Sequence, residues 1–167
     1  MVLFSNRKKV LITQTFAPTA KWGTIRSLFS LAAQKGWKIH HMDVKTTFLN
    51  GDLKEYVYMD QPEVFAIKGQ EQKVCKLVKS LYGLKQAPRA WYENLIEHLL
   101  KLNYKHFNLD DATLFVKKVG RSIVYLVVYV DDFLITVNND DYLSSIKIDL
   151  IFFSYDKFGI ITLLFRN

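Results

Sequence analysis

The sequence has very little cysteine, since Cys75 is the only one in 167 residues. A single thiol excludes an internal disulfide and cannot build a zinc ribbon or a C₂H₂ finger. A reducing compartment is compatible with this, and the alternating stretch around Cys75 favours strand packing. No apolar run reaches the ~18 residues that a membrane span requires, and the apolar stretch at the start is too short for a signal peptide. We therefore expect a soluble intracellular protein, cytoplasmic or nuclear, that contacts no membrane.

Internal repeats and low-complexity segments are also missing, and no change of composition marks a domain boundary. The chain is 50% hydrophobic and 14% aromatic, which predicts a folded protein rather than a disordered one. Its length suits one domain with a real core, so we expect 1–167 to form a single domain. Lys and Arg number 23 against 16 Asp and Glu, a formal charge of +7. This excess favours a polyanionic partner, although solubility alone can account for it.

Hydrophobic periodicity predicts two longer helices. The first covers 20–35, with Thr19 as its N-cap and Gly36 as its stop, and the second covers 89–102 with Pro88 in its first turn. Alternating or apolar runs predict strands at 37–44, 56–59, 73–79 and 112–116, followed by a hairpin and a last helix over 142–152. This order predicts an α+β fold with helices packed on one face of an antiparallel sheet.

Asp131 and Asp132 lie between two apolar runs, 123–130 and 133–137, that are typical of buried strands. Because burying an unpaired carboxylate in a strand is costly, we expect the pair at the turn of a hairpin. One interpretation is a polar hairpin tip, where Asp is common. The other is a cation site, since Mg²⁺ binds carboxylate oxygens. Asp43 ends an earlier strand, and if the two strands are neighbours, three carboxylates converge at one edge of the sheet.

Such a group of carboxylates can hold two Mg²⁺ ions about 3.5–4 Å apart. One ion would activate a 3′-hydroxyl and the other would hold a triphosphate, which supplies most of what phosphoryl transfer needs. A nuclease uses the same ions on a water, and the carboxylates alone do not decide between the two reactions. Phe48, five residues after Asp43, is placed either to wall a nucleotide pocket or to pack in the core. His40 and His41 can pack or cap rather than bind an oxygen-preferring metal.

Five basic residues surround the loop before the second long helix. They are Lys73, Lys76, Lys79, Lys85 and Arg89. Their charge suits the phosphate backbone of a nucleic acid. A solvated strand face is the alternative interpretation for some of them.

A series of short motifs runs along the chain. In order, they are TFAP at 15–18, LAAQKGW at 31–37, MDVKTTFLNGDL at 42–53, VYM at 57–59, QP at 61–62, KSLYGLKQAPRAWY at 79–92, DATLF at 111–115 and YVDD at 129–132. Each motif is weak by itself, but the ordered set is specific. Over about 15–139, the chain resembles the reverse transcriptase domain of Ty1/copia-type LTR retrotransposons, which is a fragment of a Pol polyprotein.

The resemblance implies an RNA-directed DNA polymerase with a right-hand fold, of which this chain would be the palm with part of the fingers. It assigns three groups of residues: Asp43, Asp131 and Asp132 as catalytic metal ligands; Phe48, Tyr82, Gly83 and Lys85 at the nucleotide; and Tyr129, Val130, Pro88 and Arg89 at the primer and template. The implied cofactors are two Mg²⁺ ions, with Mn²⁺ as the alternative. The implied partners are dNTPs, an RNA or DNA template with its primer, and the remainder of a Pol polyprotein.

The chain departs from the family pattern at both ends. Family members carry a basic segment of the form Lys-x-Arg-Leu-Val-Ala-Lys-Gly, whereas 6–13 keep the charge but not the pattern. After Asn139 the match decays, and Phe158-Gly159 resembles the family's Leu-Gly primer-grip turn only faintly. We find no thumb and no RNase H domain, so we expect a truncated copy with weak or no activity alone. The alternative is a non-catalytic nucleic-acid-binding remnant.

Overall fold

The computed structural model describes residues 16–108, 110–155 and 162–165, whose strands form a five-stranded and a three-stranded sheet. The helices are α1 (Trp22–Lys35), α2 (Ala87–Lys101) and α3 (Leu143–Tyr155). The strands are β1 (Ile39–Asp43), β2 (Asp52–Asp60), β3 (Lys73–Lys79), β4 (Lys105–His106), β5 (Leu114–Val119), β6 (Ser122–Tyr129), β7 (Asp132–Val137) and β8 (Thr162–Phe165). The short 3₁₀ turns are η1 (Thr47–Asn50), η2 (Glu63–Phe65) and η3 (Asp140–Tyr142). The basic segment at 6–13 and the Phe158-Gly159 pair lie outside the described residues.

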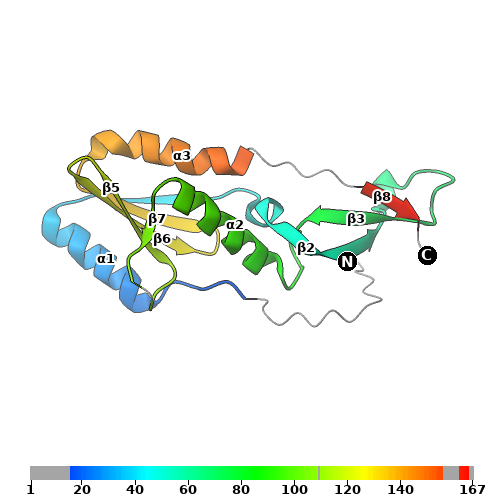
Figure 1. Cartoon of the computed structure of the whole chain (residues 1–167), viewed down its shortest axis with the longest axis horizontal. Helices are drawn as coiled ribbons and strands as arrows, with labels where there is room; N and C mark the ends of the chain where they lie inside the picture. The colour runs from blue at the N-terminus through cyan, green and yellow to red at the C-terminus, as the bar shows by residue number, and fades with distance from the viewer. Residues whose placement is uncertain (1–15, 109, 156–161, 166–167) are drawn as a thin grey trace.

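The five-stranded sheet, called the large sheet below, lies with the helices toward one end of an elongated molecule, and the three-stranded small sheet lies toward the other (Figure 1). The strand order of the large sheet is β1-β7-β6-β5-β4, and neighbouring strands are antiparallel. β1 comes from a distant part of the chain and pairs with β7, from Ile39 opposite Thr136 to Asp43 opposite Asp132. Through this pairing, β1 forms one edge of the large sheet, and the end of β1 lies beside the start of β7.

α2 and α3 cover one face of the large sheet. Side chains alternate along a strand, so every second residue of β6 and β7 points to this face. The core that these elements share includes Val124, Leu126, Val128, Phe133, Ile135, Trp91, Leu95, Leu99, Ile146 and Leu150. Burial of each large side chain contributes about 1.5–3 kcal/mol relative to leaving it exposed. This core therefore holds the hairpin of β6 and β7 firmly against α2.

α1 covers the opposite face of the same sheet. Its Leu28 and the preceding Ala20 pack against Val127, with Leu114 and Leu134 at the margin. The prediction that the helices lie on one face is therefore wrong. Periodicity shows which side of a helix is apolar, but it does not say which face of the sheet that side covers. The nearly continuous apolar sequence of β6 is explained by burial on both faces.

The small sheet has the order β2-β3-β8. β2 pairs with β3, and the register shifts between Asp52 and Val57, as at a β-bulge. A small apolar cluster on this sheet contains Val57, Met59, Cys75 and Leu77. Cys75 is buried in this cluster, which confirms its predicted role in strand packing. Burial also raises the pKa of its thiol.

The two sheets meet where β2 begins against the start of α2. A Cβ atom on Gly51 would lie 2.6 Å from Ser80 Oγ and 2.8 Å from the backbone nitrogen of Trp91. The Ser80 amide donates to the Gly51 carbonyl over 2.8 Å, and Asn94 Nδ2 donates to the Asn50 carbonyl over 2.6 Å. Only a residue without a side chain fits this crossing point, which explains the glycine.

Most of the predicted elements occur. β3 covers the predicted 73–79, and α1 ends at Gly36, which adopts a left-handed φ of 66°. The predicted capping role of Thr19 is wrong, because α1 begins after Lys21 and no side chain caps it. The sequence pattern does not predict β4 or β8. Within the described ranges, none of the helices combines the length and the apolar character needed to cross a bilayer.

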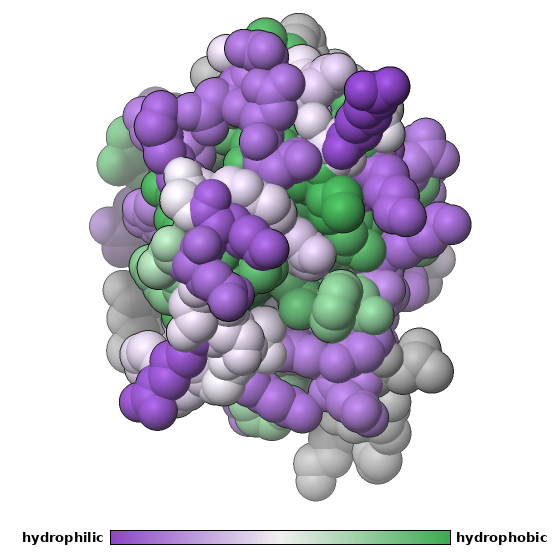
Figure 2. Space-filling view, turned by 90° about the vertical axis from the view of Figure 1, so that its left-hand side faces the viewer, coloured by the Kyte–Doolittle hydropathy of each residue, from purple (hydrophilic) through white to green (hydrophobic). Residues whose placement is uncertain are grey.

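The surface is largely hydrophilic at the end of the molecule that carries α1 and the left-hand ends of β5 and α3. Figure 2 shows this end in space-filling form, with a hydrophobic area enclosed by hydrophilic side chains. α1 contributes exposed aromatic rings to the surface of the protein, since Trp22 and Phe29 are 72% and 48% exposed.

Candidate active site

Three carboxylates come together in the backbone at one end of the large sheet. Asp43 is the last residue of β1 and lies directly opposite Asp132, the first residue of β7. Asp131 occupies the turn before Asp132, and its carbonyl accepts a hydrogen bond of 2.9 Å from the Val44 amide. The condition set by the sequence, that these two strands are neighbours, is therefore met. The hairpin turn removes Asp131 from the strand interior, where a carboxylate would be costly to bury.

The hairpin tip is held in an unusual conformation. Val130 has a φ of 58°, in the left-handed region that a β-branched residue rarely adopts. Such a residue costs on the order of 1–3 kcal/mol and persists only where its surroundings hold it. Trp91 Nε1 in α2 donates a hydrogen bond of 2.8 Å to the Val130 carbonyl, and the Trp91 side chain is almost fully buried. The tip and the start of α2 thus form one rigid unit next to Asp131.

His41 contacts one of the three carboxylates. Its Nε2 lies 2.6 Å from Asp132 Oδ1, and both side chains are partly exposed. This contact of the His41 ring therefore orients the Asp132 carboxylate. The neighbouring His40 has a buried Nε2 that finds no hydrogen-bond partner in the described part of the chain.

The donor atoms suit a hard divalent cation, since carboxylate oxygens are the ligands that Mg²⁺ prefers. In the described residues, however, no group of three or more His, Cys, Asp and Glu side chains is gathered closely enough to hold a metal ion. The backbone brings Asp43, Asp131 and Asp132 to the same end of the sheet, whereas their side chains do not converge. Binding one cation with all three carboxylates therefore requires their side chains to turn toward one another.

The predicted nucleotide residues Phe48 and Tyr82 lie against each other. Their ring centroids are 4.6 Å apart and the rings are tilted by 60°. Phe48 is partly buried against the main core, while Tyr82 is 58% exposed. Gly83 follows with a φ of 94°, which a residue with a side chain rarely adopts, and the Lys85 side chain is exposed. The core-packing interpretation of Phe48 is therefore supported by its contact with the main core, and its role at a nucleotide stays a prediction.

The predicted primer and template residues come from the two parts that Trp91 joins. Tyr129 ends β6 and is 42% exposed, next to the strained Val130. Pro88 and Arg89 lie in the first turn of α2. Arg89 Nε is hydrogen-bonded to Glu93 Oε1 over 2.7 Å. The fold therefore brings these four residues to one region beside the carboxylates.

The predicted basic loop is not a uniform surface. Lys79 is only 13% exposed and forms an ion pair with Asp52, so it is part of the internal structure and its assignment to a nucleic-acid surface is wrong. Lys76 Nζ lies 4.1 Å from the centroid of the Tyr56 ring, a cation–π contact. Lys85 and Arg89 remain near the predicted site.

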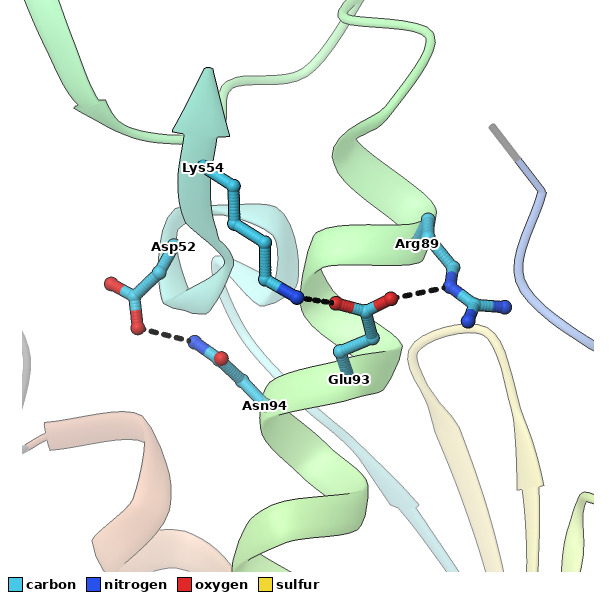
Figure 3. A network of polar contacts seen from close by, with 5 residues as sticks. All are labelled: Asp52, Lys54, Arg89, Glu93 and Asn94. Atoms are coloured by element: carbon cyan, nitrogen blue, oxygen red, sulfur yellow. Dashed lines mark hydrogen bonds and ion pairs between the residues drawn. The ribbon is translucent and has the colours of Figure 1, made fainter. Parts of the chain in front are cut away.

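Sequence reasoning missed a group of polar residues that connects the small sheet to α2 (Figure 3). Glu93 binds both Arg89 and Lys54, and Asn94 binds Asp52 over 2.8 Å. The four-residue spacing of Arg89 and Glu93 on a helix is a signal that could have been found. The contact with Lys54 could not, because it depends on how β2 crosses the helix.

Residues 3–164 match the family model described as reverse transcriptase (RNA-dependent DNA polymerase). This chain belongs to the reverse transcriptase family. It is 44% identical over 142 residues to the Retrovirus-related Pol polyprotein from transposon RE1 of Arabidopsis thaliana, a match that covers 85% of the chain and 10% of that protein. The reverse transcriptase chain is also 40% identical over 147 residues to the Pol polyprotein from transposon TNT 1-94 of Nicotiana tabacum, covering 88% and 11%.

A yeast relative extends the comparison. The Transposon Ty1-BL Gag-Pol polyprotein of Saccharomyces cerevisiae is 31% identical over 129 residues, which cover 76% of the chain and 7% of that protein. These names identify a Ty1/copia-type reverse transcriptase domain. The chain spans about a tenth of the length of the first plant relatives. No solved structure matches it. The reverse transcriptase family uses divalent metal ions, which agrees with the oxygen donors at the end of the large sheet.

Proposed function

We propose that this reverse transcriptase chain carries out RNA-directed nucleotidyl transfer at the end of the large sheet. The observation that carries the proposal is the pairing of Asp43 with Asp132, which places both beside Asp131 at the hairpin tip. On this proposal, the large sheet with α2 and α3 is the palm, the small sheet is part of the fingers, and both belong to one domain. The reverse transcriptase family membership supplies the class of reaction.

Asp43, Asp131 and Asp132 would hold two Mg²⁺ ions, with Mn²⁺ as an alternative. When bound, such ions lower the barrier to attack by a primer 3′-hydroxyl and stabilise the charge of the leaving group. Asp43 and Asp131 would be the main ligands of the ions, with Asp132 in support. His41 contacts Asp132, and the hydrogen bond from Trp91 to Val130 ties the residue before Asp131 to α2.

Phe48 and Tyr82 form the proposed wall of the nucleotide site, with Gly83 and Lys85 next to the triphosphate. The exposed Tyr82 ring offers an aromatic surface beside a deoxyribose, and the exposed ammonium of Lys85 suits a phosphate. Four further residues are proposed to contact the primer and the template: Tyr129, Val130, Pro88 and Arg89. The proposed partners are dNTPs, an RNA or DNA template with its primer, and the remainder of a Pol polyprotein.

The test is single-nucleotide incorporation on a poly(rA)/oligo(dT) primer–template with Mg²⁺ or Mn²⁺, comparing the wild-type chain with Asp131→Asn. Asp141→Asn is the matched control, because Asp141 is an exposed carboxylate in η3, away from the hairpin tip. We expect incorporation that Asp131→Asn abolishes and Asp141→Asn leaves intact. Incorporation that survives Asp131→Asn would reject the metal site.

A non-catalytic nucleic-acid-binding remnant is the second candidate. The observation that favours it is that the three carboxylate side chains do not gather in the described part of the structure. A folded wild-type chain that binds a primer–template in a salt-sensitive way, but incorporates no nucleotide with either ion, would establish this alternative.

A further inference from the structure

We propose that Glu93 is a positioning residue, which holds the Arg89 guanidinium in the orientation that binds a phosphate of the primer–template. The inference rests on the proposed function, because it requires a nucleic acid at the start of α2. It concerns three residues, Lys54, Arg89 and Glu93, which are called the Glu93 bridge below. No part of the sequence pattern assigns a role to Glu93 or Lys54.

The Glu93 carboxylate uses its two oxygens on two cations from different elements. Oε1 accepts a hydrogen bond from Arg89 Nε over 2.7 Å, and Oε2 accepts one from Lys54 Nζ over 2.6 Å. Arg89 and Glu93 are one helical turn apart on α2, whereas Lys54 comes from β2 of the small sheet. Figure 3 shows Glu93 between the other two side chains. The carboxylate therefore ties the small sheet to the arginine.

The contact with Glu93 leaves the two terminal nitrogens of the Arg89 guanidinium available to a ligand. Glu93 takes the Nε–H group, so the two terminal nitrogens of Arg89 are not used by this contact. These two nitrogens present N–H groups in a planar fork that matches the oxygens of a phosphate. In Figure 3 the guanidinium extends from α2 on the side where the β6–β7 hairpin lies. The Trp91 hydrogen bond independently places this part of α2 next to the hairpin tip.

The next residue on α2 strengthens the tie to β2. Asn94 Nδ2 donates to Asp52 Oδ2 over 2.8 Å and to the Asn50 carbonyl over 2.6 Å. Asp52 is also paired with Lys79 of β3. Adjacent residues on α2 therefore bind the same end of β2. The orientation of Arg89 depends on this arrangement and not on the helix alone.

The ionisation state of Glu93 is suited to this role. Its hydrogen bonds from Lys54 and then from Arg89 lower the pKa of the Glu93 carboxyl, so it is charged at neutral pH. The side chains of Glu93 and Arg89 are each 34% exposed, which leaves the pair open to a ligand from solvent. An ionised carboxylate repels a nearby nucleic acid. If Glu93 has no positioning role, neutralising it should therefore strengthen binding, whereas if Glu93 orients Arg89, neutralising it should weaken binding.

The experiment measures binding of the full chain to a fluorescently labelled RNA–DNA primer–template by anisotropy, at several salt concentrations. Glu93→Gln is compared with Glu97→Gln, which removes the same charge from the same helix. Glu97 forms an equivalent i,i+4 pair with Lys101 over 2.7 Å, and this pair is exposed. If Glu93 positions Arg89, Glu93→Gln weakens binding about three- to tenfold although the chain becomes more positive. Glu97→Gln leaves binding unchanged or slightly tighter. Binding by Glu93→Gln that equals or exceeds the wild type overturns the inference.

Arg89→Gln and the double variant provide a readout that a merely structural role would not move. Loss of one phosphate contact lowers the slope of log K against log salt by roughly 0.7–0.9. We expect this change for Arg89→Gln, and we expect the double variant with Glu93→Gln to bind no more weakly than Arg89→Gln alone. Additive losses would show that Glu93 acts independently of Arg89 and would reject the positioning role.

A second pair of variants covers the case in which Glu93→Gln does not fold. Lys54→Gln removes the sheet side of the Glu93 bridge, and Lys101→Gln removes an equal charge from α2. We expect Lys54→Gln to weaken binding more than Lys101→Gln, and equal effects would contradict the inference. A wild-type chain that shows no salt-dependent binding would reject the proposed function itself, whereas normal wild-type binding with an unaffected Glu93→Gln rejects only this inference.

Discussion

The large sheet and the small sheet are built in different ways. The large sheet is buried on both faces, by α2 and α3 on one side and α1 on the other. The small sheet has a four-residue apolar cluster. Several large apolar side chains on it and on the loop between β2 and β3 are exposed: Tyr56, Val64, Phe65, Ile67 and Val78. Among the side chains that the structure describes, β2 and β3 therefore contribute fewer buried apolar residues than the strands of the large sheet.

The difference has a functional meaning. The proposed catalytic carboxylates lie at the end of the well-packed sheet, where the core restricts backbone movement. The small sheet joins α2 through Gly51, Asn94 and the Glu93 bridge, which are polar or close backbone contacts. Polar contacts of this kind can be altered without removing the core. The molecule thus has a well-packed part that carries the proposed catalytic carboxylates and a second part whose attachment can be tested residue by residue.

The largest effect is expected in the core of the large sheet. Leu126 is fully buried in β6, and Leu126→Ala should lower the free energy of unfolding by about 2–5 kcal/mol. Leu77→Ala is the same substitution in the small sheet, at a residue that is 3% exposed. We expect a smaller loss of unfolding free energy there, because the apolar cluster around Leu77 is smaller and can collapse more easily around the missing atoms. Chemical denaturation followed by circular dichroism measures both, and equal losses would contradict the comparison.

The junction between the sheets gives the next effect. Gly51→Ala places a methyl group against Ser80 and the backbone of Trp91, and it should destabilise the chain by about 1–3 kcal/mol. Gly23→Ala is the control, because nothing lies within 4 Å of its added Cβ. Gly23 lies in the first turn of α1, where that substitution should be neutral or stabilise by less than the roughly 0.5–1 kcal/mol of a mid-helix position. Thermal unfolding compares the two variants, and a neutral Gly51→Ala would show that the junction has room.

The α1 side of the large sheet has a pH-dependent contact. Asp111 accepts hydrogen bonds from Thr24 and from the amide and hydroxyl of Thr113. Burial alone would raise the pKa of Asp111, but the hydrogen bonds from Thr113 and Thr24, with the charge of Lys21, together lower it. A carboxyl whose pKa is lower in the folded state stabilises the fold at pH values above its pKa in the unfolded chain. This contribution is lost as the pH falls below about 4.

Asp111→Asn should therefore lower stability at pH 7 by about 1–2 kcal/mol and should make the acid limb of the stability curve less steep. Urea unfolding between pH 3 and pH 7 measures both changes. Asp110→Asn is the neighbouring control, since Asp110 is exposed and contributes its backbone carbonyl to Lys21. An acid limb that is equally steep in Asp111→Asn and the wild type would show that other carboxylates control it.

The last prediction concerns the hairpin tip. Trp91→Phe keeps an aromatic ring in the core but removes the hydrogen bond to the Val130 carbonyl, at a cost of roughly 0.5–1.5 kcal/mol for the hydrogen bond alone. The smaller ring leaves a cavity at this buried position, which adds to the loss. The left-handed Val130 should then relax. Single-nucleotide incorporation should therefore fall by more than the loss of folded protein explains. Amide hydrogen exchange at the tip checks the relaxation. Unchanged exchange with lowered incorporation would place the role of Trp91 elsewhere.

Local elements were largely predictable because they depend on spacing within a few residues. β3 has the predicted range, α1 stops at Gly36, and Pro88 lies in the first turn of α2. Elements stabilised by distant partners were not. β4 is a two-residue strand that exists through its pairing with β5, and the N-terminal end of α1 lacks the capping residue that the pattern favours.

Part of the candidate site was also predictable. The apolar runs on both sides of Asp131 and Asp132 identify a hairpin, and the ordered motifs identify the reverse transcriptase family. The partners of these residues were not predictable. His41 against Asp132 and Lys54 against Glu93 join residues that are far apart in the chain. Lys79, which spacing places on a basic surface, is paired internally with Asp52.

By itself, the sequence determined the helices, most of the strands, the hairpin with its two carboxylates and the family, because periodicity, turn residues and ordered motifs are properties of neighbouring residues. The tertiary structure alone decided that Asp43 lies opposite Asp132, that α1 covers a different face from α2, and that Glu93 connects Arg89 to β2. These arrangements depend on how whole apolar faces pack and which strands exchange hydrogen bonds. Packing of this kind is a property of the folded chain, and no short stretch of sequence encodes it.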